Sequence, residues 1–310
     1  MPPTVLIPTP PFDLDATARH QTYYQREMGA DAYHDETYYR ALEMEGRHLL
    51  ALVRSTGTVE APRVTVELKG AQLPTESVAT VTHSISRILG LDLDLRPFYV
   101  VAGDDPFLSK AVQTFYGLHP TRTASVFEAL VTAITGQQIS GAVARAIRAR
   151  VVRTLGTSIV VDIDTFYTFP KATDFLEAGQ DKLRSFGLSA RKAEYILEVA
   201  SRAADGTLDL QRLEKLSNND VVEELVQIRG IGQWTAQWTL LSALGRSDAF
   251  PSGDLALKRV ISEYYFDGEP ITDDETTAFA SERWGNYAGL ATTYLFAYIR
   301  HNRASRGQPE

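Results

Sequence analysis

The spacing of apolar residues changes near residue 112 and divides the chain into two parts. Before that point, strand patterns and helix patterns follow one another along the chain. The stretch "YYRALEMEGRHLLALVRS" predicts two strands around a turn at Glu45-Gly46, and "RVTVELKG" predicts a third. "PTESVATVTHSISRILG" has helical spacing and ends at a glycine. The pattern indicates a small antiparallel sheet with helices packed against it.

Beyond residue 112, helical spacing predominates and strand signals mostly vanish. Helices are predicted in "SVFEALVTAITGQQISGAVARAIRARVVRTLG", "SARKAEYILEVASRAADG", "NNDVVEELVQI", "DLALKRVISEYY", "TDDETTAFASERW" and "YAGLATTYLFAYIRHNRA". We therefore expect an α+β protein with an α/β N-terminal domain over residues 1–112 and an all-α remainder. The remainder is expected to form a helical domain over 113–250 and a C-terminal helical lobe over 251–310. The chain before residue 125 would complete that lobe, and an active site would lie between the two lobes.

Composition narrows the class of protein. The chain has 310 residues, of which 44% are hydrophobic and 23% charged, as in soluble globular proteins. It has no cysteine, which excludes disulfides, thiolate zinc sites and iron–sulfur clusters held by thiolates. The six histidines have no metal-ligand spacing, so no catalytic metal is expected. The N-terminus lacks a signal-peptide pattern, and no apolar run is long enough to span a membrane, which predicts a cytoplasmic protein without a membrane partner.

The distribution of charge leaves a nucleic-acid partner open. A net charge of −8 argues mildly against one. Residues 113–192, however, carry ten basic and only six acidic side chains. Such a block can form a basic face that meets phosphates, and it can equally be the solvated surface of ordinary helices.

The stretch "LVQIRGIGQWTAQWTLLSALG", residues 225–245, lies within a predicted helix-hairpin-helix over 219–245. Gly230 and Gly232 permit a tight turn, and the amides at the start of the following helix are then free to bind an anion. Thr235, in the first turn of that helix, can add a hydroxyl. A G-x-G turn between helices is by itself often only a connection.

The longer string is more specific. "VQIRGIGQWTA" followed by "LSALGRSDAFPSGDLALKRV" resembles the hairpin, the Gly/Pro-rich loop and the aspartate of helix-hairpin-helix DNA glycosylases. "FEALVTAITGQQIS", "ERWGNYAGLATTYLFAYIR" and the N-terminal "DAYHDETYYRALEMEGRHLLALV" extend the resemblance to the AlkA-type 3-methyladenine DNA glycosylase II family over almost the whole chain. The resemblance implies a DNA repair enzyme that flips alkylated purines out of double-stranded DNA and hydrolyses their N-glycosidic bond.

The resemblance assigns the catalytic role to Asp254, whose carboxylate would stabilise an oxocarbenium-like sugar and assist the attacking water. The string "GDLALKR" also makes Asp254 a good helix N-cap, and the two roles are compatible because a helix N-terminus favours the ionised form. Relatives that cut the DNA backbone carry a lysine where this chain has Trp234. Lys258, one turn past Asp254, is expected to face outward, so the enzyme is predicted to be monofunctional, without lyase activity.

The remaining site residues also follow from the resemblance. Trp234, with Trp238 and Tyr287 nearby, would form an aromatic pocket whose indoles stack on a cationic alkylated base. Aromatics at this spacing are also common in cores, and Trp284 is expected to be one of those. Gln138 stands at the position of the wedge that fills the vacated stack, where some relatives carry an apolar residue; it can also be an ordinary loop residue.

DNA backbone binding is expected from Gly230, Gly232 and Thr235. The family also implies a monovalent cation, Na⁺ or K⁺, held by the main-chain carbonyls of Val226, Ile228 and Gly230; no cofactor is expected to be needed for catalysis. A monomer associated with the nucleoid is expected. Two alternatives stay open: a glycosylase for a different damaged or mispaired base, and a non-catalytic DNA-damage-binding protein of the same fold.

Overall fold

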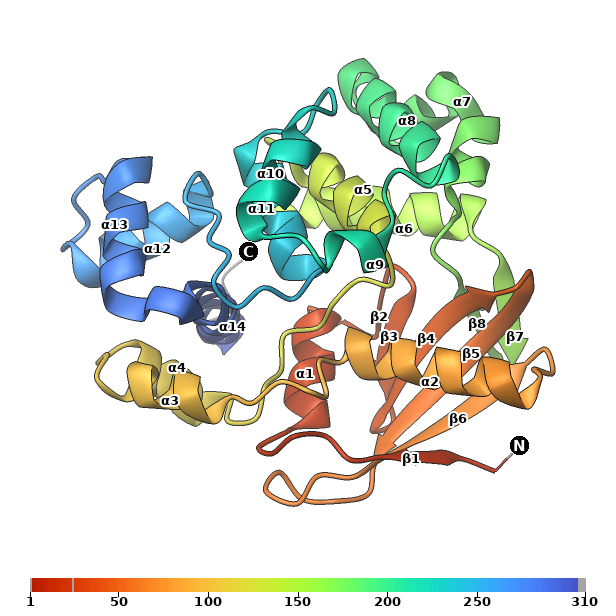
Figure 1. Ribbon diagram of the computed structural model, residues 1–310, viewed down its shortest axis with the longest axis horizontal. Coiled ribbons are helices and arrows are strands. Elements are labelled where there is room, and N and C mark those ends of the chain that lie inside the picture. Colours follow the sequence, from red (N-terminus) through yellow and green to blue (C-terminus); the bar gives the residue numbers. More distant parts are fainter. Residues whose placement is uncertain (1, 24, 306–310) are drawn as a thin grey trace.

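The computed structural model describes residues 2–23 and 25–305, and its first part is built on a six-stranded antiparallel sheet (Figure 1). The strand order is β1-β6-β5-β4-β3-β2. The strands are β1 (Thr4–Leu6), β2 (Glu27–Met28), β3 (Asp31–His34), β4 (Thr37–Met44), β5 (Arg47–Ser55) and β6 (Val64–Gly70). The predicted hairpin is confirmed: Glu45 and Gly46 join β4 to β5 with φ of 53° and 73°, the positive values that a tight two-residue turn needs.

Two helices cover one face of this sheet, as the spacing predicts. Helix α1 (Leu14–Gln21) contributes Leu14 and Ala18, and α2 (Thr75–Ile88) contributes Ile85 and Ile88. These side chains are buried against apolar residues of β5 and β6, including Val53 and Val66. The central strand β5 is buried on both faces, because Leu50 and Leu52 belong to a separate apolar cluster, so its apolar residues form a continuous run.

The second core belongs to the lobe that carries the hairpin. It is formed by α5 (Val126–Gly136), α6 (Gly141–Leu155), α7 (Ala172–Ser185), α8 (Ala190–Ala204), α9 (Leu210–Leu213), α10 (Asn218–Val226) and α11 (Gln233–Ser242). Ser189 caps α8, since its side chain accepts a hydrogen bond from the Lys192 amide. The turn between α10 and α11 is the hairpin expected from the two glycines.

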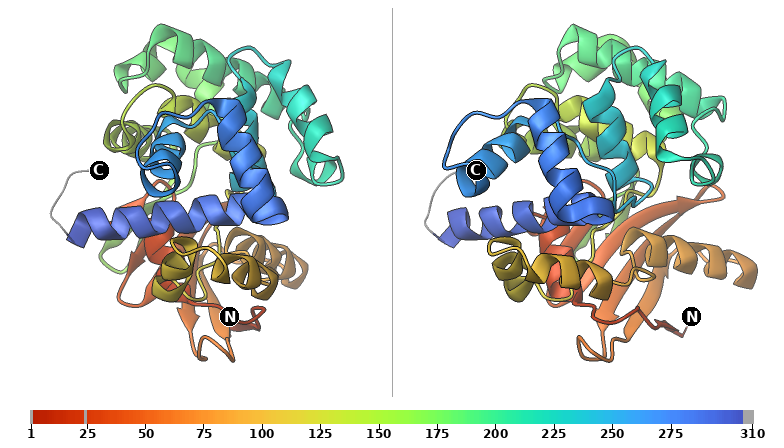
Figure 2. Two further views of the ribbon diagram at one scale, coloured as in Figure 1. Left: turned by 90° about the vertical axis from the view of Figure 1, so that its left-hand side faces the viewer. Right: turned by 60° about the vertical axis from the view of Figure 1, so that its left-hand side comes forward.

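A third core forms the C-terminal lobe, from α12 (Leu255–Tyr265), α13 (Asp273–Trp284), the 3₁₀ turn η1 (Gly285–Tyr287) and α14 (Ala288–Ser305). Two helices from early in the chain, α3 (Arg96–Gly103) and α4 (Leu108–Thr114), pack into the same core, and α4 lies beside α14 (Figure 2). The expectation that earlier chain completes this lobe is confirmed. The boundary at residue 112 is wrong, because the apolar faces of residues 96–114 are buried in the C-terminal lobe and not on the sheet.

Trp284 has the core role that was expected. It is 1% exposed, and its indole donates to the buried carboxylate of Asp105. Arg283 and Tyr265 donate to the same carboxylate. Burial opposes the charge of Asp105, but the hydrogen bond from the Leu108 amide and those from these three side chains hold its pKa below the usual value.

The prediction that residues 113–250 are all helical is wrong at one place. Strands β7 (Ser158–Val161) and β8 (Asp164–Tyr167) form a hairpin. The sequence there, "TSIVVDIDTFYTF", is rich in β-branched and aromatic residues. Ile159 and Phe166 bury their side chains against Leu50 and Leu52 of the N-terminal sheet. Because an isolated two-stranded hairpin is only marginally stable, this tertiary contact decides its conformation.

A buried ionic network joins the N-terminal sheet to α5. Arg40, which is 1% exposed, donates to Asp31 at 3.0 Å and to Glu128 at 2.6 Å. Burial disfavours the guanidinium charge, but the two carboxylates keep the pKa of Arg40 above its ordinary value. Glu128 also accepts from the Ala124 amide, so the network fixes the start of α5 on the sheet.

Within the described residues, no helix is long and apolar enough to cross a membrane.

Replacing Arg40 with alanine would leave two buried carboxylates unpaired. We expect Arg40→Ala to lower the free energy of unfolding by about 3–5 kcal/mol, measured by urea denaturation. Arg54→Ala, which removes an exposed pair with Glu67, is the matched control and should cost less than about 1 kcal/mol. Equal losses in the two variants would contradict a structural role for the buried network.

Candidate active site

Asp254 lies where α11 and α12 meet, and its carboxylate accepts three hydrogen bonds. Oδ1 accepts from the amide of Leu257 at 2.9 Å, which makes Asp254 the N-cap of α12. Oδ2 accepts from the indole Nε1 of Trp234 at 2.9 Å and from that of Trp238 at 3.2 Å. Three N–H donors therefore hold the two oxygens of the Asp254 carboxylate in place. The sequence predicts the N-cap, whereas the two indole hydrogen bonds are new.

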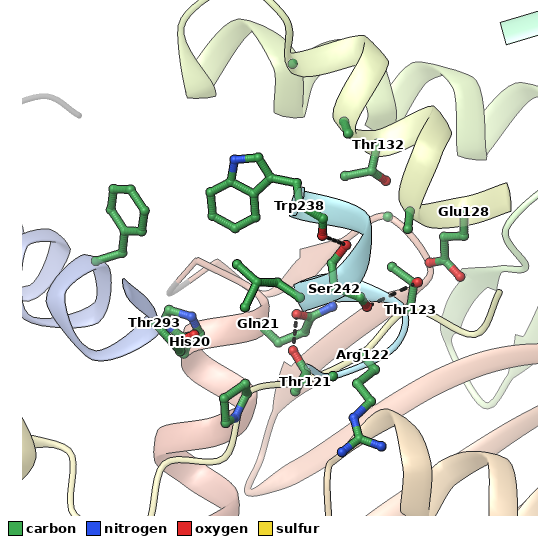
Figure 3. A pocket seen from close by; sticks show the side chains of 18 of the residues that line it. His20, Gln21, Thr121, Arg122, Thr123, Glu128, Thr132, Trp238, Ser242 and Thr293 are labelled. Carbon is green, nitrogen blue, oxygen red and sulfur yellow. Dashed lines mark hydrogen bonds between the residues drawn. The ribbon is translucent and has the colours of Figure 1, made fainter. Parts of the chain in front are cut away.

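A cavity of about 420 Å³ opens beside this carboxylate (Figure 3). Asp254, Trp234 and Trp238 line it, together with residues of α5, α6 and α14. The two indole rings cross at 69° with their centroids 6.4 Å apart. Trp234 and Trp238 are therefore on the cavity wall, as predicted, and are not core residues. Polar side chains of the N-terminal domain and the following loop also contribute to the wall, including Gln21 and Thr121, which hydrogen-bond each other (Figure 3).

Tyr287 does not line this cavity. Its ring packs against Phe98 in the core of the C-terminal lobe, with centroids 6.2 Å apart. Phe296, from α14, is on the cavity wall, and its ring lies at 30° to Trp238 with centroids 6.1 Å apart. The expectation that Tyr287 belongs to the base pocket is thus not met, because the 3₁₀ turn before α14 directs this residue into the lobe core.

Sequence reasoning missed a basic cluster on the same cavity, formed by Tyr23, Arg148 and Arg300. The Arg300 guanidinium lies 4.1 Å from the centroid of the Tyr23 ring, and its charge lowers the pKa of Tyr23 even though burial opposes this. The positive charge of Arg148 lowers the pKa of Tyr23 further. His20 lines the cavity nearby, where burial and the charge of Arg300 lower its pKa to about 3. Only the fold brings these residues together, since they come from three separate parts of the chain.

The two glycines of the hairpin, Gly230 and Gly232, have different structural roles. Gly230 has φ of +93°, and a Cβ there would lie 2.1 Å from Cγ of Tyr195. Gly232 is the exposed N-cap of α11, and nothing lies within 4 Å of its Cβ position. Gly230 therefore permits close packing on α8, while Gly232 leaves the first amides of α11 open to an anion.

Thr235 is not placed to bind the DNA backbone as predicted. It is 1% exposed, and its hydroxyl accepts a hydrogen bond from Gln137. The outward-facing start of the helix is formed by Gly232 and Gln233 instead, because the third helical residue is turned toward α5. Gln138 is exposed and lies in the loop between α5 and α6, with φ of +56°.

Two further polar residues lie as expected. The ammonium group of Lys258 pairs with Asp273 of α13 and does not line the cavity beside Asp254. Asp248 is an exposed loop acid whose carboxylate accepts from Asn218. Across the described part of the chain, no group of three or more His, Asp or Glu side chains is arranged to hold a metal ion.

The model of the HhH-GPD superfamily of base excision DNA repair proteins matches residues 131–286, half of the chain and the part that holds both the hairpin and Asp254. The chain belongs to this superfamily. It is 34% identical to a DNA-3-methyladenine glycosylase of Bacillus subtilis over 209 residues, which are 67% of this chain and 69% of that protein.

Among solved structures, a 3-methyladenine DNA glycosylase from Archaeoglobus fulgidus superposes with a TM-score of 0.84 at 29% identity. The match covers 96% of this chain and 98% of that one. An 8-oxoguanine glycosylase/lyase of Clostridium acetobutylicum, in complex with double-stranded DNA, matches with a TM-score of 0.75 at 20% identity and so shares the fold. The family resemblance read from the sequence is confirmed for this HhH-GPD protein.

The different surroundings of the two glycines give a testable contrast. Gly230→Ala should destabilise the protein by about 1–3 kcal/mol, because the methyl group would overlap the Tyr195 ring and the backbone has a positive φ. Gly232→Ala should change stability by less than about 1 kcal/mol, the cost of alanine at an N-cap. Urea denaturation of both variants measures this, and an equal effect would contradict the packing of the hairpin on α8.

Proposed function

We propose that this protein is a monofunctional DNA glycosylase of base excision repair that hydrolyses the N-glycosidic bond of alkylated purines flipped out of duplex DNA. The observation that carries the proposal is the Asp254 carboxylate, held by two indole N–H groups on the wall of a cavity large enough for a base. The likeness to 3-methyladenine glycosylases over most of the chain supports the substrate class.

Asp254 performs the chemistry. As the bond between the base and C1′ breaks, positive charge develops on the sugar, and a fixed carboxylate beside C1′ stabilises it. The same carboxylate orients the attacking water and accepts its proton. The indole hydrogen bonds to Oδ2 and the Leu257 amide to Oδ1 fix both carboxylate oxygens, so little reorganisation accompanies the reaction.

The walls near Asp254 suit an electron-poor base. Bases alkylated at N3 of adenine or N7 of guanine are cationic, and indole faces attract cations by about 0.5–2 kcal/mol. Such bases leave without protonation, so the site needs no general acid. The cavity is charged unevenly, because Arg148 and Arg300 line another part of its wall. A cationic base is therefore favoured beside Asp254 and the indoles, and disfavoured beside the guanidinium groups.

DNA is held by the hairpin and opened by the loop before α6. The amides at the start of α11 bind a backbone phosphate at the open surface around Gly232, and Gln138 enters the stack that the flipped nucleotide leaves. Within this proposal the protein acts as a monomer on double-stranded DNA.

The proposed Na⁺ or K⁺ would be held by the carbonyls of Val226, Ile228 and Gly230. Ile228 already accepts from the Ile231 amide, and Gly230 accepts from the side chain of Gln137. A carbonyl oxygen has two acceptor positions, so each of these two keeps one for a cation. When bound, the cation would add positive charge at the hairpin for a DNA phosphate, and no catalytic step depends on it.

The variant Asp254→Asn tests the catalytic role. Asparagine is as good an N-cap as aspartate, so the fold should be kept while base release falls by at least about 100-fold. Release of 3-methyladenine and 7-methylguanine from methylated duplex DNA is measured by chromatography under single turnover. Asp248→Asn is the matched control and should retain wild-type rates. A wild type that binds the duplex but releases neither base would refute the alkyl specificity.

The absence of lyase activity is tested separately. A lyase needs an amine that forms a Schiff base with C1′. Trp234 occupies the position of the family's lysine, and Lys258 is paired with Asp273. Borohydride should therefore trap no covalent complex with lesion-containing DNA, and the product should be an intact strand with an abasic site. Any trapped complex would contradict the monofunctional mechanism, and its loss in Lys258→Ala would identify Lys258 as the reacting amine.

A further inference from the structure

Gln137 connects the loop that carries Gln138 to the hairpin. Its side-chain amide donates to the carbonyl oxygen of Gly230 at 3.1 Å and to the hydroxyl of Thr235 at 3.0 Å. These two acceptors are separated from Gln137 by more than 90 residues and lie on either side of the hairpin turn. Gln137 is half-buried, whereas Gln138 beside it is exposed. Of the two adjacent glutamines, one therefore faces the protein and the other faces solvent.

The surroundings of Gln137 fix the same loop from a second side. Lys192 of α8 donates to the carbonyl of Thr135, in the last turn of α5, at 2.9 Å. The ring of Tyr195, one turn further along α8, packs directly against Gly230. Helix α8 thus holds both the end of α5 and the hairpin, and Gln137 closes the connection between them. Gln137, Lys192 and Tyr195 also line a surface pocket of about 460 Å³. The exposed residues Gln138 and Gly232 line the same pocket.

The backbone of Gln138 needs such support. It has φ of +56°, a left-handed conformation that costs a residue with a side chain about 1 kcal/mol. The next fixed point along the chain is Ser140, whose side chain caps α6. Gln138 is therefore held between a cap on one side and the hydrogen bonds of Gln137 on the other. Without the hydrogen bonds of Gln137, the backbone of Gln138 would relax toward negative φ, and its side chain would point in a different direction.

We propose that Gln137 is a positioning residue that sets the distance between the inserting side chain of Gln138 and the hairpin that grips the backbone. Successive bases on one strand are about 3.4 Å apart, so a wedge that fills one vacated position must be placed more finely than that. A misplacement of about 1 Å can cost a factor of about 100 in rate. The proposal rests on the proposed function, in which Gln138 enters the DNA stack.

A purely structural role for Gln137, as the residue that ends α5, makes a different prediction. Loss of a purely structural residue would lower the stability of the protein and would slow base release from every substrate by the same factor. A positioning role affects only reactions that require insertion into a stack. Single-stranded DNA has no orphaned partner base and no continuous duplex stack, so it separates the two roles.

The experiment compares Gln137→Glu, Gln137→Ala, Gln138→Ala and the double variant Gln137→Ala/Gln138→Ala. Glutamate has the size of glutamine but cannot donate to the Gly230 carbonyl when ionised. Insertion of the Gln138 side chain is measured as a change in the fluorescence of 2-aminopurine, placed opposite a tetrahydrofuran abasic analogue in a duplex. This measurement requires no catalysis. Base release is measured on methylated duplex and methylated single-stranded DNA. Gln113→Ala, an exposed glutamine of α4, is the matched control.

Gln137→Glu and Gln137→Ala are expected to reduce the fluorescence change at least fivefold and to slow release from duplex DNA about tenfold. Release from single strands should change less than twofold. The double variant should be no slower than Gln138→Ala, because Gln137 acts through Gln138. Equal losses on both substrates, additive effects in the double variant, or no insertion signal in the wild type would overturn the proposal. An insertion signal that is present in the wild type and lost in Gln137→Glu, without base release by either, would support it while refuting the proposed catalysis.

Discussion

The site depends on one carboxylate that is shared by two helices. Oδ2 of Asp254 accepts from the two indole N–H groups of α11, and Oδ1 accepts from the amide of Leu257 in the first turn of α12. Trp234 and Trp238 are one turn apart, so both reach the same oxygen only if α12 begins opposite that face of α11. The position of α12 is in turn fixed by the loop before it, where the Gly289 amide donates to the Ser247 carbonyl. A Cβ at Gly289 would lie 2.4 Å from Leu241 and 2.8 Å from the Ser247 carbonyl oxygen, so the contact between the lobes requires glycine there.

The N-terminal domain contributes residues to the cavity wall and is fixed to the helical lobe that carries the hairpin. Arg40 and Glu128 join it to α5, and Arg87 of α2 donates to the carbonyls of Thr123, Ala124 and Ala243 around the end of α11. Through these contacts Gln21 and Tyr23 are held on the cavity wall. Each of the three parts of the chain that form the site is thus held by hydrogen bonds of its own.

Features set by neighbouring residues could be predicted from the sequence, and features set by tertiary contacts could not. The turn at Glu45-Gly46, the hairpin glycines and the cap at Asp254 depend on local backbone preferences, which the sequence states directly. The strands β7 and β8 are formed because the N-terminal sheet buries Ile159 and Phe166. The predictions for Thr235 and Tyr287 are wrong for a related reason. The family pattern gives the position of each residue along the chain, but the direction of its side chain depends on the neighbouring element. Thr235 is turned toward α5, and Tyr287 packs against α3. No pattern in the sequence links Tyr23 to Arg148 and Arg300.

The uneven charge of the cavity bears on how the proposed reaction is accelerated. In the ground state the positive charge of an alkylated base is on the base, and in the transition state it moves to the sugar. A carboxylate beside C1′ interacts more strongly with the second arrangement than with the first. Guanidinium groups on the wall of the same cavity oppose a cation in the base and have less effect once the base is neutral. Both charges therefore favour the transition state over the bound substrate, which is the condition for raising the rate and not only the affinity. In the proposed mechanism the paired indoles would bind the cationic base, and because they also fix Asp254 they would connect recognition of the lesion to the group that breaks the bond.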